Sequence, residues 1–141
     1  MNRCILTNRN GRTHAYFRQF NRAYANIDAR GGRTTSTFDA VGNATSLTDP
    51  VGNRTSWTYD ALNRVTVETD PLDAISTFAY DAASQLTSST DRLGRVKNFG
   101  CDARGFNTAE TWVAAGSALQ SLAFAYDAVG NRTLAANSAG A

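Results

Sequence analysis

The chain has 141 residues, of which 18% are charged, and a formal net charge of +2, which excludes both a disordered polymer and a domain that is basic throughout. Residues 1–33 hold seven arginines against one acid, a pattern that suits a phosphate contact or, as we favour, a solvated surface. Two cysteines and one histidine exclude a disulfide framework and a zinc site. No apolar run resembles a signal peptide or a membrane span.

The first expected segment, residues 1–27, is a degenerate repeat or an irregular stretch. The sequence "RQFNRAYANID" (18–28) overlays "DALNRVTVETD" (60–70), but Arg18 stands where the later copy has Asp60. The residues before it lose the pattern.

Residues 28–134 form a repeat region of about five units with a period of 21. An Asp follows an aromatic residue, or a Cys in one copy, and a second Asp lies about halfway along each unit. The first series is Asp39, Asp60, Asp81, Asp102 and Asp127, and the second is Asp28, Asp49, Asp70 and Asp91. Each unit is therefore two half-units that both open with Asp.

The half-units have the residues of tight turns. Asp accepts backbone N–H bonds at the first position of a type I turn. A Gly three residues later supplies the positive φ of a bulged hairpin loop. Asn63 is the next best residue at that position, whereas Asp73 and Ser84 predict looser turns. The glycines that fit are Gly42, Gly52, Gly94, Gly105 and Gly130, with Gly31 in the same register.

Short strand-forming stretches follow the turns. In "RVTVET" (64–69) Val65 and Val67 alternate with polar residues, and "SWTY" (56–59) and "STFAY" (76–80) place aromatics two apart. Four extra residues in "WVAAGSALQS" (112–121) predict a longer loop, and residues 135–141 predict a disordered tail. The fold class is therefore all-β, with antiparallel β-hairpin repeats that form an open, spiralling sheet.

Catalysis and metal binding have weak candidates. Asp49-Pro50 and Asp70-Pro71 could form a carboxylate pair of the aspartyl-protease kind, but both occupy ordinary turn positions. Each turn offers only one or two carboxylates, too few for a calcium loop. We therefore expect no enzyme activity, no metal site and no cofactor.

The repeating phrase resembles the YD repeat of the RHS family. The residues that carry the resemblance are Phe38-Asp39-Ala-Val-Gly42, Tyr59-Asp60-Ala-Leu-Asn63-Arg64, Tyr80-Asp81, Tyr126-Asp127-Ala-Val-Gly130-Asn-Arg132, Asp49-Pro-Val-Gly52 and Asp91-Arg-Leu-Gly94. The resemblance implies a spiralling hairpin sheet that, in full-length relatives, closes into a shell around a toxic C-terminal polypeptide. Bacterial polymorphic toxins, insecticidal toxin complexes and teneurins are similar.

The resemblance implies a scaffold function for this chain, as a fragment of the repeat region. Its partners would be further YD repeats of a larger parent and an enclosed toxin domain, without nucleic acid or a membrane span, and its relatives are secreted or attached to cell surfaces. An alternative is a carbohydrate- or cell-surface-binding module. The aromatics that would stack on sugar rings are Trp57, Tyr59, Tyr80, Trp112 and Tyr126.

Overall fold

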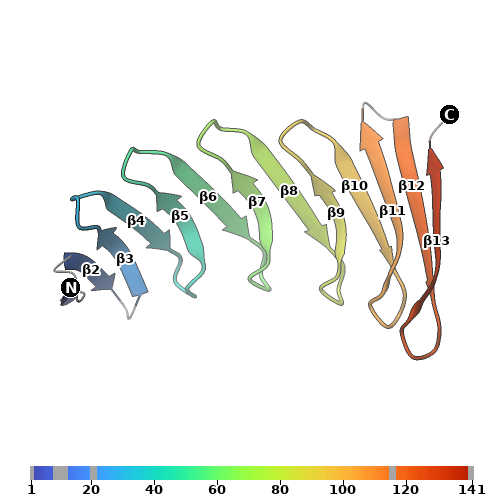
Figure 1. Ribbon diagram of the computed structural model, residues 1–141, viewed down its shortest axis with the longest axis horizontal. Coiled ribbons are helices and arrows are strands. Elements are labelled where there is room, and N and C mark those ends of the chain that lie inside the picture. Colours follow the sequence, from blue (N-terminus) through green and yellow to red (C-terminus); the bar gives the residue numbers. More distant parts are fainter. Residues whose placement is uncertain (1, 8–12, 20–21, 115–116, 140–141) are drawn as a thin grey trace. The chain divides into compact units, whose positions relative to one another are not determined.

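The computed structural model describes residues 2–7, 13–19, 22–114 and 117–139, and these form thirteen strands and no helix (Figure 1). A membrane-spanning helix is therefore not found among them. The strands are β1 (Asn2–Thr7), β2 (Thr13–Gln19), β3 (Arg22–Ile27), β4 (Arg33–Phe38), β5 (Ala44–Thr48), β6 (Arg54–Tyr59), β7 (Val65–Thr69), β8 (Ile75–Tyr80), β9 (Leu86–Thr90), β10 (Val96–Cys101), β11 (Asn107–Ala114), β12 (Ser117–Tyr126) and β13 (Arg132–Ala139).

The chain divides into two compact units, Met1–Ala74 and Ile75–Ala141. Within each unit the strands pair in chain order and all pairs are antiparallel, β1 to β7 in the first and β8 to β13 in the second. This confirms the all-β fold of antiparallel hairpin repeats. Because strands in a meander follow one another directly, the turns of the two Asp series lie at opposite ends of the strands.

The Asp turns share one set of backbone hydrogen bonds, except that at Asp39 the Gly42 N–H donates to the side-chain Oδ1 of Asp39 in place of its carbonyl. At Asp49 the backbone N–H donates to the Asn53 carbonyl over 2.9 Å, and the Gly52 N–H donates to the Asp49 carbonyl over 3.1 Å. The residue three positions after Asp has a positive φ, 97° for Gly52. This is the three-residue hairpin loop, a type I turn followed by a left-handed residue, which the Asp-x-x-Gly pattern predicts.

The expectation of looser turns at Asp73 and Ser84 is wrong. Their φ angles are 60° and 65°, and their N–H groups donate to the carbonyls of Asp70 and Asp81 over 3.0 and 3.1 Å. A single residue in the left-handed region costs little compared with the set of hydrogen bonds that closes the loop. The loop therefore keeps its form with a less suitable residue.

A β-bulge lies in each hairpin whose turn begins at an Asp of the first series, which we call the motif Asp. The hairpins whose turns begin at an Asp of the second series show no bulge in their described ladders. In β4–β5, Thr37 pairs with Ser46 but Phe38 pairs with Ala44, so that Thr45 is the extra residue. The equivalent extra residues are Thr66, Thr87, Thr108 and Thr133. A Thr six residues after the motif Asp thus marks every bulge in these hairpins.

Two details near the C-terminus correct the sequence prediction. The four extra residues do not form a longer loop among the residues described but lengthen the hairpin, because β11 has 8 residues and β12 has 10. Residues 135–139 are not a disordered tail but belong to β13, which pairs with β12 as far as Gln120 opposite Ala139. Small polar residues suffice there because the ladder is built from backbone groups; residues 140 and 141 lie outside the described part.

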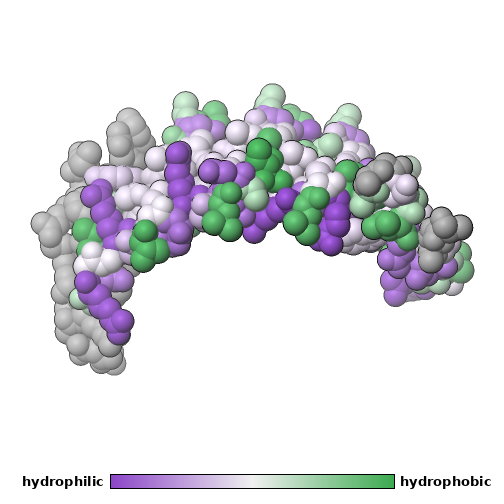
Figure 2. All heavy atoms as spheres, turned by 90° about the horizontal axis from the view of Figure 1, so that it is seen from above, coloured by the Kyte–Doolittle hydropathy of each residue, from purple (hydrophilic) through white to green (hydrophobic). Residues whose placement is uncertain are grey.

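Neither unit has a conventional core. Among the described residues only Ala25 is a buried apolar residue, and no large side chain is fully buried. Apolar residues instead stand at the turn tips, where they form green patches among polar side chains in Figure 2. The apolar residues that lie two positions after an Asp are 60–87% exposed; they are Val41, Val51, Leu62, Leu72, Leu93 and Val129. Stability must therefore come mainly from the ladders, the turns and contacts across one layer.

Candidate functional site

The motif carboxylates are held by their own turns. The Oδ1 atom of Asp49 accepts hydrogen bonds from the N–H groups of Val51 and Asn53, both over 2.9 Å, and its Oδ2 accepts from Asn53 Nδ2 over 2.8 Å. Asp127 uses Val129 and Asn131 in the same way. Each carboxylate therefore replaces the water that would otherwise satisfy the loop amides.

Arginine takes the place of Asn in two turns. Arg64 Nε donates to Asp60 Oδ2 over 2.7 Å, and Arg95 Nε donates to Asp91 Oδ2 over the same distance. The hydrogen bond from the Arg64 amide, and then that from its side chain, lower the pKa of Asp60 against a burial effect that raises it. The Arg95 side chain is the largest cause of the lowered pKa of Asp91. These carboxylates are ionised and engaged at neutral pH.

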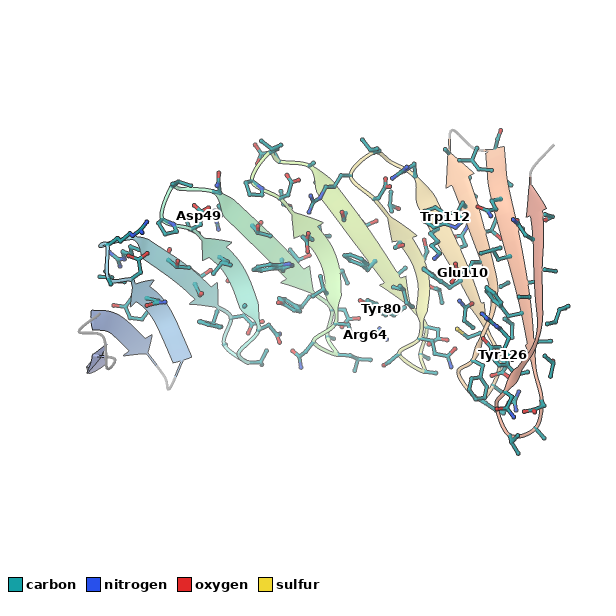
Figure 3. The ribbon with its side chains drawn as sticks, viewed as in Figure 1. Asp49, Arg64, Tyr80, Glu110, Trp112 and Tyr126 are labelled. Atoms are coloured by element: carbon teal, nitrogen blue, oxygen red, sulfur yellow. The ribbon has the colours of Figure 1, made fainter. Side chains whose placement is uncertain are left out.

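The two Asp-Pro pairs do not depart from this pattern. Asp70 is buried, and its Oδ1 accepts from the N–H groups of Leu72 and Ala74 over 2.8 and 2.9 Å, as Asp49 does within its own turn. Figure 3 shows Asp49 at the turn opposite the end that carries Arg64. Both carboxylates therefore have the turn role that the sequence favoured over a proteolytic pair.

The tyrosine of the motif joins consecutive hairpins. The Tyr59 hydroxyl donates to the carbonyl of Ala44 over 2.7 Å, and the Tyr126 hydroxyl donates to the carbonyl of Asn107 over 2.9 Å. Ala44 and Asn107 both lie five residues after the preceding motif Asp. The same bond thus occurs at the same repeat position in two of the repeats.

The ladder between neighbouring hairpins ends before that carbonyl and leaves it to a side chain. The β5–β6 ladder begins at the pair Ser46 and Ser56, so Ala44 lies beyond it on the motif-turn side, where the two hairpins separate. In the same way the β11–β12 ladder begins at Ala109 and Ala123, beyond Asn107. A buried carbonyl without a partner is costly. The tyrosine hydroxyl continues the connection where the backbone ladder has ended.

In the second unit, aromatic and arginine contacts reinforce this connection. The rings of Phe106 and Tyr126 stack with centroids 4.9 Å apart, and the Arg104 guanidinium lies 4.8 Å from the Phe106 centroid. Arg104 Nη1 also donates to the Asp127 carbonyl over 2.9 Å, while its Nη2 contacts Asp102. Two consecutive motif turns are therefore tied together by a ring stack and a charged hydrogen bond.

The single lysine lies in a second cluster of this unit. Lys97 Nζ is 2.6 Å from Glu110 Oε2 and 4.8 Å from the ring centroids of Phe99 and Trp112. Glu110 Oε1 accepts from Asn107 Nδ2 over 2.7 Å. Because Lys97 and Glu110 are about four-fifths buried, this pair fixes the β10–β11 face rather than presenting a free charge.

In the first unit, an open cavity of about 440 Å³ lies between the turns of Asp39 and Asp60. Trp57 and Tyr59 line it, and Asn43 Nδ2 donates across it to Asn63 Oδ1 over 2.8 Å. The Trp57 indole N–H donates to Glu68 over 3.1 Å. The cavity is the space between neighbouring motif turns, bridged by an amide pair.

Four of the five proposed sugar-binding aromatics make side-chain contacts within the sheet. Trp57 donates a hydrogen bond to Glu68, and Tyr59 donates one to the Ala44 carbonyl. The Lys97 ammonium lies over the Trp112 ring, and Tyr126 stacks on Phe106. Tyr80 ends β8 at the equivalent position (Figure 3). Among the described residues no three His, Cys, Asp or Glu side chains gather as a metal site.

Sequence reasoning missed the bulge threonines and the two carbonyl acceptors. The recurring Thr six residues after the motif Asp was a visible signal for the bulge. The acceptor role of the Ala44 and Asn107 carbonyls gave no signal in the sequence, because every residue has a backbone carbonyl whatever its side chain.

The variant Tyr126→Phe tests the connecting bond. It should lower the free energy of unfolding by about 1 kcal/mol, because the Asn107 carbonyl loses its partner while the ring stack remains. Urea denaturation followed by fluorescence measures the loss. Tyr126→Leu, which also removes the ring, should cost more, and a Tyr126→Phe protein as stable as the parent would show that the hydroxyl does not join the hairpins.

Comparisons with known proteins agree with this architecture. The family model described as "RHS Repeat" matches residues 38–75. No curated protein matches the chain. Solved structures share the fold: the Tc holotoxin pore of Photorhabdus luminescens with mutation TccC3-D651A has a TM-score of 0.67 at 19% identity over 92% of this chain and 7% of that one. The crystal structures of TcdB2-TccC3-Cdc42 and TcdB2-TccC3 have TM-scores of 0.69 and 0.68, both at 19% identity over 96% of this chain, and cover 7% and 8% of theirs.

Proposed function

We propose that this chain is a structural segment of an RHS shell wall, associated with the encapsulation and delivery of a toxin. The match of the RHS Repeat family model to residues 38–75 supports this proposal. The chain spans less than a tenth of the toxin-complex chains that it resembles. The shell, its cargo and its delivery are therefore properties proposed for a larger parent that contains this segment.

The observation that carries the proposal is the use of the motif residues. The tyrosine hydroxyls bond to the preceding hairpin, and the aspartates bond to their own turns. A catalytic or ligand-binding group would need a face directed at a substrate. Tyrosine hydroxyls that bond one hairpin to the next have the role expected in a structural wall.

The scarcity of buried apolar side chains among the described residues of each unit supports the same role. A strand repeat buries its apolar side chains only against neighbouring repeats. The partners that suit this segment are therefore further YD repeats on either side, and the proposed cargo is a C-terminal toxin domain inside the closed wall. The comparisons lend no support to the carbohydrate-binding alternative.

A transplant tests the wall function. Residues 49–90, two periods of 21, replace two matched repeats in the wall of the TcdB2-TccC3 complex. We expect the chimera to keep its C-terminal domain as resistant to added protease as the parent complex does. The measurement is the rate of cleavage of that domain on gels.

The matched control carries the same 42 residues in scrambled order and should open the wall to protease. The proposal is wrong if the transplanted chimera folds, as judged by far-UV circular dichroism, and yet leaves the domain as accessible as the scrambled control does.

A further inference from the structure

The cavity between the turns of Asp39 and Asp60 has an equivalent place in the second unit, between the turns of Asp102 and Asp127. In both pairs of turns a tyrosine precedes the later Asp and donates its hydroxyl to the carbonyl five residues after the earlier Asp. The two places are therefore built alike, and they differ in the side chains that lie beside that tyrosine.

In the second unit a phenylalanine ring fills this place. Phe106, four residues after Asp102, stacks on Tyr126 with ring centroids 4.9 Å apart and ring planes inclined by 22°. Gly130 leaves room for the ring, because a Cβ there would lie 2.8 Å from Phe106 Cζ. The ring of a motif tyrosine is thus a surface on which a phenylalanine ring packs.

In the first unit two amides stand at the positions of that ring and that glycine. Asn43 lies four residues after its motif Asp, and Asn63 lies three residues after the next one. Asn43 Nδ2 donates to Asn63 Oδ1 over 2.8 Å. Beside this amide pair lies the open cavity of about 440 Å³, which is lined by Trp57 and Tyr59. Such a volume is within the range of binding sites for small ligands and side chains.

We propose that this cavity binds a phenylalanine side chain of a partner polypeptide, as its equivalent in the second unit holds Phe106. Trp57 and Tyr59 supply two aromatic rings for it, and Val41 and Ala61 add apolar surface. Aromatic pairs gain stability beyond the area that they bury, so the site favours a ring over an aliphatic side chain. This binding site goes beyond the proposed wall function and does not depend on it.

The same comparison specifies a cation on the partner. The Arg104 guanidinium lies 4.8 Å from the Phe106 ring centroid, and its Nη1 donates to the Asp127 carbonyl over 2.9 Å. The equivalent acceptor in the first unit is the Asp60 carbonyl, and Val41 holds the position of the arginine. Among the described residues that line the cavity two are acidic and none is basic. An Arg-x-Phe segment therefore suits the site better than an isolated ring.

The test measures the binding of such a segment to the full chain. The probe is a peptide of residues 103–107, Ala-Arg-Gly-Phe-Asn, with capped ends and a fluorine at the para position of its Phe106 ring. Fluorine NMR should show a shift that saturates as protein is added, and unlabelled peptide should reverse it. The peptide with Phe106→Leu should compete at least about tenfold less well, because it cannot stack. The peptide with Arg104→Gln should compete about fivefold less well.

Two protein variants locate the site. Asn43→Phe combined with Asn63→Gly gives the first unit a ring of its own and the room for it, so this variant should no longer bind the probe. Gln85→Phe makes the same kind of substitution at the same turn position, four residues after Asp81 and outside the cavity lining. It should bind the probe as the parent does. Far-UV circular dichroism shows whether both variants keep the fold.

Four outcomes would overturn the proposal. They are a parent protein without a saturable shift, a Leu peptide that competes as well as the Phe peptide, a filled variant that is folded and still binds the probe, and a Gln85→Phe variant that is folded and does not. Methyl glucoside is the sugar arm of the test and should leave the probe bound. If it displaces the probe as well as the unlabelled peptide does, the cavity is a sugar site and the aromatic side-chain site is wrong.

Discussion

Gly130→Ala is expected to lower the free energy of unfolding by about 3 kcal/mol. Gly130 has a φ of 92°, a region that side chains with a Cβ resist. A Cβ there would also lie 2.8 Å from Cζ of Phe106, the ring that stacks on Tyr126. Backbone strain and forced movement of a packed ring each cost about 1–3 kcal/mol, and here they act together.

Gly94→Ala separates these two causes. Gly94 occupies the equivalent turn position in the same unit with a φ of 73°, but nothing lies within 4 Å of its would-be Cβ. It should cost only about 1 kcal/mol. Chemical denaturation of both variants gives the comparison. Equal losses would mean that Phe106 yields freely and that the contact between the two motif turns contributes little.

Acid is expected to unfold the sheet cooperatively as the pH falls below about 4. The pKa values of Asp39, Asp49, Asp60, Asp91, Asp102 and Asp127 are all lowered from the ordinary value of 3.8. For Asp127 the largest cause is the hydrogen bond from the Asn131 side chain. A carboxylate with a lower pKa in the folded protein adds stability above its unfolded pKa and loses it as the pH falls through the folded value.

A pH titration followed by far-UV circular dichroism measures the transition, with urea melts at pH 7 and pH 3 as the quantitative comparison. Asp127→Asn keeps an acceptor oxygen but cannot titrate. It should be less stable than the parent at pH 7 and should lose less stability between the two pH values. A sheet that keeps its strand signal and its urea midpoint down to pH 2 would contradict the role of the ionised turns.

The repeat and its turns could be predicted because they depend on local chemistry. The Asp of each half-unit and the residue with positive φ three positions later are fixed by bonds within five residues, as at Asp49 and Gly52. Even Ser84, which the sequence placed in a looser turn, adopts the same form, because the loop closure has more bonds than one residue's φ preference can oppose.

What could not be predicted depends on partners distant in sequence. The Tyr59 hydroxyl reaches a carbonyl 15 residues earlier, which lies on another strand beyond the end of the β5–β6 ladder. The longer β11–β12 hairpin and the extension of β13 to Ala139 were missed for a related reason. Both are decided by backbone pairing, to which small residues such as those after 134 contribute no sequence signal.

The scarcity of buried apolar side chains among the described residues has a mechanical consequence. In each unit the described strands contact only their neighbours along the chain, so nothing anchors a hairpin except the hairpins beside it. If the two ends of the polypeptide were pulled apart, the hairpins would unfold one after another from an end instead of all at once. With a period of 21 residues and about 3.4 Å per extended residue, each step would release roughly 70 Å of chain.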